Sequence, residues 1–228
     1  MKLLLATLIL GWSPTMPPDV IKESDFNMQV KSLEQLATRQ QVEINVLQTK
    51  IKDLESKIEK HDIQITYYKI LSLRPNVNRS LATEIAKHVH NYSKANDIDE
   101  DLILAIIRVE SYFDQYAKSY AKARGLSQIM LSFWRDECNI TIKNIYDIET
   151  NVGCGVKVFL TYYKRYNDVS LALVSYNRGP EDVDRSLSNH LKINYSYEKL
   201  VKKFYKQIKS TQYPSASNDT RAIKWTIK

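Results

Sequence analysis

Glu110 is the residue best placed for chemistry, because it ends an apolar run with helical spacing. The run predicts a helix from Asp99 to Phe113. Glu110 comes three residues after Ile107 and seven after Ile103, so its carboxyl group shares the face of the isoleucines. Apolar surroundings raise the pKa of a carboxyl group. A glutamic acid that keeps its proton near neutral pH is suited to act as a general acid in glycosidic cleavage.

Two later segments carry amides, hydroxyls and glycines suited to sugar binding. They are Gly125-Leu126-Ser127-Gln128-Ile129 and Ser175-Tyr176-Asn177-Arg178-Gly179-Pro180. The amides of Gln128 and Asn177 both donate and accept hydrogen bonds, and Tyr176 adds a flat ring with a polar tip. Glycine lets the backbone approach a ligand closely. Taken without these segments, Glu110 could equally pair with an arginine, Arg108 or Arg124, and serve only packing.

In their order and spacing, these motifs resemble the soluble, goose-lysozyme-like lytic transglycosylases over residues 97–185. Glu110-Ser111 matches the family's Glu-Ser pair, and residues 125–129 match its Gly-Leu-Met-Gln-Ile segment, with Ser127 in place of methionine. Residues 175–180 match its Ala-Tyr-Asn-Ala-Gly-Pro segment. The resemblance implies an all-α fold of the mostly helical lysozyme-like superfamily, over residues 78–208, acting on peptidoglycan.

The resemblance also implies a mechanism with one carboxyl group and no metal or cofactor. Glu110 protonates the glycosidic oxygen between N-acetylmuramic acid and N-acetylglucosamine, while the substrate's own 2-acetamido group attacks the anomeric carbon. Glu110 then takes the proton of the C6 hydroxyl, and a 1,6-anhydro ring closes. The residues implied to bind or orient the substrate are Ser111, Gly125, Ser127, Gln128, Tyr176 and Asn177.

Two alternative functions remain open from the sequence. Asp114 lies four residues after Glu110. If it activates water, the chain is a hydrolase of the lysozyme type, because most glycosidases use two carboxyl groups. In the other alternative, the chain is a non-catalytic structural protein, with a coiled coil followed by a domain that binds glycan and cleaves nothing.

A coiled coil is expected over residues 26–72, ahead of the domain. Apolar residues repeat at the a and d positions of a heptad through residues 30–68, which is typical of helices that pair along one seam. Ile at a with Leu at d favours two parallel strands, and Lys50 would then face Glu55 of the partner. We therefore expect a homo-oligomer; the alternative is an amphipathic helix that folds back on its own domain. The repeat comprises Val30, Leu33, Ala37, Ile44, Leu47, Ile51, Leu54, Ile58, Ile65 and Tyr68.

The two ends and the overall charge complete the expected organisation. Residues 1–18 resemble an export signal or membrane-tethering segment, and residues 209–228 form a flexible tail. The chain of 228 residues has a net charge of +7, which favours an anionic partner. Nucleic acid is not expected, because the basic residues are scattered along the chain. The location implied is the periplasm or cell envelope, or a virion if the source is viral.

Cys138 and Cys154 are the only cysteines. In an exported protein they could form a disulfide, which would close a loop of about 16 residues. The alternative is two buried free thiols. Neither cysteine joins a histidine in a recognisable motif, so a catalytic thiol is not expected.

Overall fold

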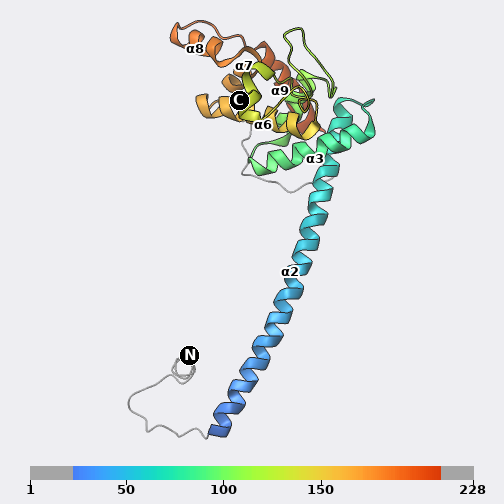
Figure 1. Cartoon of the computed structure of the whole chain (residues 1–228), viewed down its shortest axis with the longest axis vertical. Coiled ribbons are helices and arrows are strands. Elements are labelled where there is room, and N and C mark those ends of the chain that lie inside the picture. The colour runs from blue at the N-terminus through green and yellow to red at the C-terminus, as the bar shows by residue number, and fades with distance from the viewer. Residues whose placement is uncertain (1–22, 212–228) are drawn as a thin grey trace. The chain divides into compact units, whose positions relative to one another are not determined.

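The computed structural model describes residues 23–211 and contains no strand within that range. The expected all-α architecture is therefore confirmed for this part of the chain (Figure 1). The helices are α2 (Glu23–Leu73), α3 (Arg79–Ala95), α4 (Glu100–Glu110), α5 (Leu131–Cys138), α6 (Ile148–Tyr166), α7 (Val169–Arg178), α8 (Pro180–Ser188) and α9 (Ser196–Ser210).

The expected leader at residues 1–18 lies outside the described residues, and so do residues 212–228 of the tail expected over 209–228. Residues 209 and 210 belong to α9, so this helix continues past the expected start of the tail. Over residues 23–211, no helix combines the length and the apolar character needed to cross a bilayer.

The chain divides into two compact units, Met1–Glu55 and Ser56–Lys228. The described part of the first unit is the first 33 residues of α2, from Glu23 to Glu55. Its apolar seam is open to solvent: Leu33 is 45% exposed, Leu47 49% and Leu54 57%.

The second unit is built round α4, whose six central residues, Leu102 to Ile107, are all apolar and buried. Leu102, Leu104 and Ile107 are fully buried, because α4 packs against α3 on one side and α9 on another. The helix α6 contacts α3, α5 and α7, and it joins the remaining helices to this core (Figure 1).

This core begins upstream of residue 78, where the domain was expected to start. Ile65, Ile70 and Leu73 of α2 are each at most 4% exposed, and Ile70 and Leu73 belong to the main apolar cluster. The predicted coiled coil over 26–72 is therefore too long. Because the a-position residue Ile65 is buried within its own unit, the seam predicted to reach Tyr68 cannot be fully available to another chain.

The helix that carries Glu110 ends at that residue and does not continue to Phe113 as predicted. Ser111 is its C-cap, and the next two residues, Tyr112 and Phe113, have φ of 55° and 59°. Left-handed backbone is uncommon for aromatic residues and must be held by surrounding contacts. Phe113 is fully buried, and the Arg108 guanidinium lies 3.9 Å from the centre of the Tyr112 ring.

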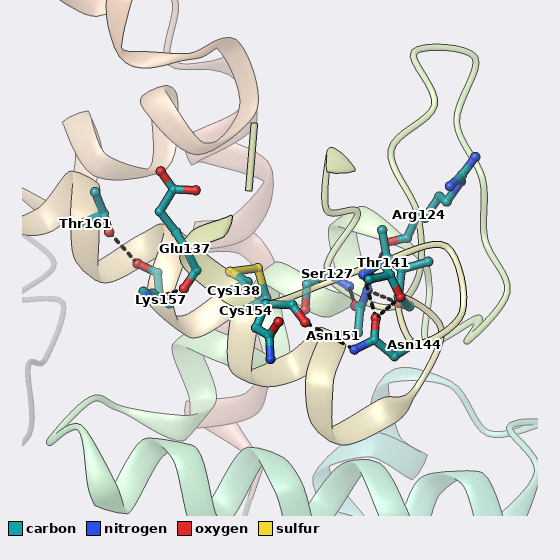
Figure 2. The surroundings of a disulfide bond; sticks show 12 residues. Arg124, Ser127, Glu137, Cys138, Thr141, Asn144, Asn151, Cys154, Lys157 and Thr161 are labelled. Atoms are coloured by element: carbon teal, nitrogen blue, oxygen red, sulfur yellow. Dashed lines mark hydrogen bonds between the residues drawn. A yellow bond between two sulfur atoms is a disulfide. The ribbon is translucent and has the colours of Figure 1, made fainter. Parts of the chain in front are cut away.

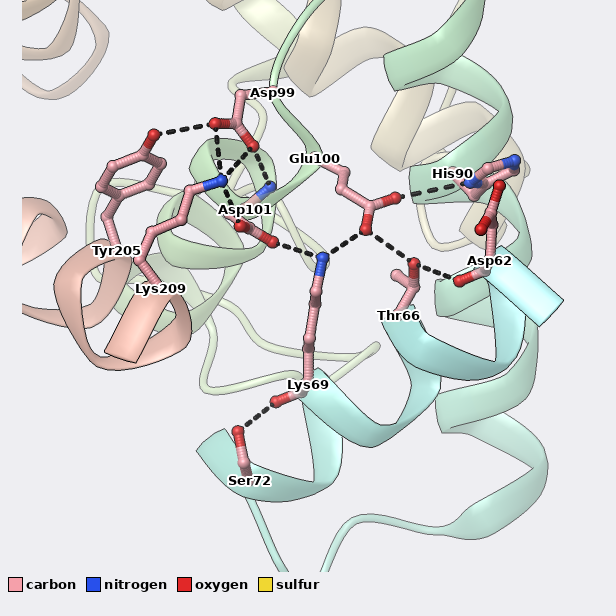
Figure 3. A network of polar contacts seen from close by, with 10 residues as sticks. All are labelled: Asp62, Thr66, Lys69, Ser72, His90, Asp99, Glu100, Asp101, Tyr205 and Lys209. Carbon is pink, nitrogen blue, oxygen red and sulfur yellow. Dashed lines mark hydrogen bonds and ion pairs between the residues drawn. The ribbon is translucent and has the colours of Figure 1, made fainter. Parts of the chain in front are cut away.

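A buried polar network fixes the opposite end of α4 (Figure 3). Asp99 caps the helix by accepting the N–H of Asp101, at 3.0 Å. The ammonium group of Lys69 lies 2.6 Å from Glu100 and 2.7 Å from Asp101, and that of Lys209 lies 2.6 Å from Asp101. The three carboxylates, one at the N-cap and two in the first turn, also interact favourably with the positive end of the helix dipole.

The ionisation of this network follows from its pairing. Burial alone would raise the pKa of Glu100, but its hydrogen bond with His90 and the charge of Lys69 outweigh burial and lower that pKa to about 2. For Lys69, burial acts to lower the pKa, and the two neighbouring carboxylates reverse the effect and raise it. Paired charges of this kind make α2, α4 and α9 depend on one another, because removing one partner leaves a buried charge uncompensated.

The expected disulfide is present between Cys138, the last residue of α5, and Cys154 of α6. The helix α5 has no fully buried residue of its own, so the covalent bond is a main attachment of this helix to the rest of the unit.

Replacing both cysteines, Cys138→Ser with Cys154→Ser, should lower the free energy of unfolding by about 3 kcal/mol, because the loop between them would then be free in the unfolded chain. Urea unfolding followed by circular dichroism measures this change. Wild-type protein unfolded in the presence of dithiothreitol is the control and should lose a similar amount. Equal stability of the oxidised wild type and the double variant would contradict the assignment.

Candidate active site

The carboxyl group of Glu110 accepts a hydrogen bond from a hydroxyl group. Tyr197, in the first turn of α9, donates a hydrogen bond of 2.5 Å to Oε1 of Glu110. Both side chains are partly buried and keep some exposure to solvent. The arrangement follows from the packing of α4 against α9, which brings residues 87 positions apart into contact.

Burial raises the pKa of Glu110 to about 7, and the hydrogen bond from Tyr197 opposes this rise only in part. A carboxyl group poised near neutral pH can give up a proton and take one back under the same conditions. This is the electrostatic property that was expected of Glu110 from the apolar run before it.

Tyr176 of α7 lies close enough to Glu110 for the charge of that carboxylate to affect the pKa of the tyrosine hydroxyl. The pKa of the Tyr176 hydroxyl is raised well above its ordinary value, first by burial and next by the negative charge of Glu110. The hydroxyl donates a 2.8 Å hydrogen bond to the carbonyl oxygen of Ser127. Tyr176 thus connects the carboxyl group to the predicted sugar-binding loop.

The loop of residues 125–129 is shaped by close backbone packing. Gly125 has φ of +78°, and a Cβ atom there would lie 2.3 Å from the amide nitrogen of Asn151. Ser127 is 2% exposed, and its Oγ would lie 2.5 Å from a Cβ atom on Gly155. Gly125 and Ser127 were expected to touch substrate; their burial gives them a structural role in this loop instead.

The side chain of Asn151, in α6, holds this loop in place through hydrogen bonds to backbone groups (Figure 2). Its carbonyl oxygen accepts the N–H of Ser127 at 2.7 Å, and its amide donates to the carbonyl oxygens of Arg124 and Ile145 at 3.0 and 2.7 Å. Asn151 is 1% exposed, so it acts on the site only through the loop.

The remaining predicted residues lie in different settings. Gln128 is partly exposed, and its amide nitrogen donates to the carbonyl oxygens of Ala117 and Gly125 at 3.2 and 3.0 Å. The hydroxyl of Ser111 donates back to Ile107 within its own helix, at 3.2 Å. Asn177 is exposed near the end of α7.

Asp114, the carboxyl group of the hydrolase alternative, is exposed and accepts the N–H of Tyr116 at 3.0 Å. This bond closes a local turn. The side chain is therefore engaged in the loop that follows α4, and it is not among the groups that shift the pKa of Glu110.

A hollow of about 370 Å³ lies beside the disulfide, lined in part by Tyr92, Glu137, Glu149 and Lys157. None of the residues predicted to touch sugar lines it. Within residues 23–211, no three His, Cys, Asp or Glu side chains are grouped so as to hold a metal ion.

Sequence reasoning missed Tyr197 and did not assign a role to Asn151. Tyr197 could have been found from its spacing, since Tyr197, Val201, Tyr205 and Ile208 fall on one helical face, the face that packs on the core. That pattern predicts that the ring of Tyr197 faces inward, but it does not predict the hydrogen bond from its hydroxyl group to Glu110.

The chain is similar in sequence to known lytic murein transglycosylases. The chain is 28% identical over 183 residues to the membrane-bound lytic murein transglycosylase C of Salmonella arizonae, covering 71% of this chain and 50% of that protein. The Haemophilus influenzae protein of the same name is 33% identical over 140 residues, covering 52% and 38%. The chain thus spans about half, or less, of the length of these relatives.

Among solved structures, the 70-kDa soluble lytic transglycosylase of Escherichia coli matches with a TM-score of 0.46 and 19% identity, over 66% of this chain and 28% of that one. The profile of the family described as "Transglycosylase SLT domain" matches residues 71–198, a range that includes Glu110, Gln128, Tyr176 and Tyr197. The chain therefore belongs to the transglycosylase SLT domain family.

Proposed function

We propose that this protein is a peptidoglycan lytic transglycosylase that cleaves the β-1,4 bond between N-acetylmuramic acid and N-acetylglucosamine and leaves a 1,6-anhydro end. The observation that carries the proposal is Glu110, whose partly buried carboxyl group has a pKa of about 7 and a hydroxyl partner in Tyr197. Family membership and the murein named in the relatives' descriptions support the same substrate.

In the first step, protonated Glu110 gives its proton to the glycosidic oxygen as the bond to the anomeric carbon breaks. The oxygen of the substrate's 2-acetamido group forms a bond to that carbon, so the N-acetylglucosamine side leaves with a new hydroxyl group. Glu110 is now charged, and the hydrogen bond from Tyr197 stabilises the carboxylate. In this proposal Tyr176, whose hydroxyl pKa is raised by the charge of Glu110, positions the acetamido group.

In the second step, the Glu110 carboxylate takes the proton of the C6 hydroxyl. The C6 oxygen attacks the anomeric carbon and displaces the acetamido oxygen, which closes the 1,6-anhydro ring and returns Glu110 to its protonated form. No water is consumed. A pKa near 7 suits both steps, because the same group must act first as an acid and then as a base.

Digestion of purified peptidoglycan, followed by mass spectrometry, tests the reaction. Products with anhydro ends, about 18 Da lighter than the hydrated muropeptides as expected for the loss of one water, are the predicted outcome. Glu110→Gln should lower the rate at least about 100-fold, because the variant has no proton to transfer.

Asp114→Asn is the matched control and should cleave at a rate close to that of the wild type. Hydrated reducing ends, together with loss of activity in Asp114→Asn, would favour the hydrolase. Binding without any cleavage by the wild type would favour the non-catalytic module.

We further infer that the first unit pairs with a second copy of the chain as a parallel coiled coil. The apolar a and d side chains from Leu33 to Leu54 are exposed, and Lys50 at g faces Glu55 at e of a parallel partner. An antiparallel pair would lose this match. The proposed seam ends before Ile65, which is buried in its own unit.

Sedimentation equilibrium of the full chain measures the oligomeric state. The wild type should give at least twice the mass of one chain, and Leu47→Asp with Leu54→Asp should give the mass of one, because charge on the seam opposes pairing. The control, Thr49→Asp with Ser56→Asp, adds the same charge at outward heptad positions and should stay oligomeric. A wild-type mass of one chain would contradict the pairing.

We also propose that the protein acts in the cell envelope. This location follows from the proposed substrate, and the relatives' descriptions as membrane-bound agree with it.

A further inference from the structure

A short hairpin projects from the loop between α4 and α5. The backbone N–H of Gly125 donates to the carbonyl of Ala117 at 2.9 Å, and that of Ser119 donates to Ala123 at 3.0 Å. Lys122 sits at the tip with φ of 68°, and its N–H donates to Ser119 at 3.0 Å. We call residues 116–125 the basic hairpin.

The basic hairpin is built directly on the candidate active site. The amide of Gln128 donates to both ends of the hairpin's base, the carbonyls of Ala117 and Gly125. The carbonyl oxygen of the neighbouring residue, Ser127, accepts a hydrogen bond from the hydroxyl of Tyr176. The charge of Glu110 raises the pKa of that hydroxyl. A ligand that reaches Glu110 is therefore close to the base of this hairpin.

The charge of the hairpin is of one sign. Residues 115–134 contain no Asp or Glu, whereas they include Lys118, Lys122 and Arg124. Lys118 and Lys122 are exposed, and none of the three cations has an ion-pair partner among residues 23–211. Cations that are left unpaired beside an active site attract anionic ligands and raise their local concentration.

The hairpin also exposes two aromatic rings that lie outside the apolar core. Tyr120 is fully exposed, and Tyr116 is 69% exposed. Tyr116 lies against Tyr146, with ring centroids 5.8 Å apart, so one face of its ring is supported and the rest is open. An amphipathic ring next to a cation suits a ligand that offers both apolar and carboxylate groups.

We propose that the basic hairpin binds the carboxylates of the peptide stems on the glycan strand, and so makes the protein prefer glycan that still carries its stems. This inference rests on the proposed function, since it names which part of the peptidoglycan the hairpin recognises. Lys118 and Lys122 supply the attraction to the carboxylates, and the tyrosines contact the stem's apolar atoms.

The test compares two substrates made from the same peptidoglycan: strands with their stems, and strands stripped of stems by an amidase. The variant is Lys118→Gln with Lys122→Gln, and the control is Lys87→Gln with Lys94→Gln, two exposed lysines of α3. The variant should lose about 3- to 10-fold in kcat/KM on stem-bearing strands and keep the wild-type value on stripped strands. The control should match the wild type on both substrates.

Salt should produce the same change, because exposed charges are screened. Raising the ionic strength from about 0.05 to 0.5 M should reduce the wild-type preference for stem-bearing strands and leave the variant little changed. Thermal melts of the two variants check that Lys122→Gln is folded, since this residue keeps its left-handed backbone.

Equal losses on both substrates, or no loss on either, would overturn the inference while leaving the proposed function intact. A wild type that cleaves neither substrate would instead contradict the proposed function. If the variant loses affinity for a short DNA duplex but cleaves both glycans at the wild-type rate, the hairpin is a nucleic-acid surface and the inference is wrong.

Discussion

A carboxyl group holds its proton to a higher pH when it is shielded from water, and the second unit keeps Glu110 in such surroundings. Seven buried residues in succession, Asp101 to Ile107, place the end of α4 against the core. There the group accepts a hydrogen bond from Tyr197 and lies near Tyr176, which contacts the loop of residues 125–129. If this carboxyl group were fully solvated, its pKa would fall and it could not act as the acid of the proposed reaction at neutral pH.

The position of Glu110 depends on how both ends of α4 are held. At the first turn, Lys69 and Lys209 bind three successive acidic residues. At the last turn, the chain leaves through two left-handed aromatic residues, Tyr112 and buried Phe113. A helix fixed at both ends cannot slide or rotate, so the direction of its terminal carboxyl group is set by residues far from the chemistry.

The loop of residues 125–129, which Tyr176 contacts, is fixed in the same way, by buried groups. Asn151 satisfies three backbone groups, and Gly125 and Gly155 leave the space that other side chains occupy. The hairpin precedes this segment, and α5, whose last residue Cys138 forms the disulfide, follows it. The candidate site thus combines a buried, hydrogen-bonded base with exposed side chains at its edge.

Much of this was predictable from local pattern, and the rest depended on tertiary contacts. The apolar spacing before Glu110 predicted a helix with that carboxyl group facing inward. The motifs at residues 125–129 and 175–180 are joined by the hydrogen bond from Tyr176 to Ser127, and the charge of Glu110 raises the pKa of Tyr176. The burial of Ser127 was not predictable, because it depends on Gly155, a residue of another helix. The heptad pattern overestimated the length of the coiled coil, because Ile65, at an a position of the same repeat, is buried in its own unit.

The most direct test is the titration of Glu110 itself, followed by the ¹³C shift of its side-chain carboxyl in protein labelled at glutamate. Subtracting the spectrum of Glu110→Gln assigns the signal. The structure predicts a midpoint at a pH of about 7. A midpoint near the ordinary value of 4.5 would mean that the group is solvated and charged at neutral pH, and the proposed acid would not exist.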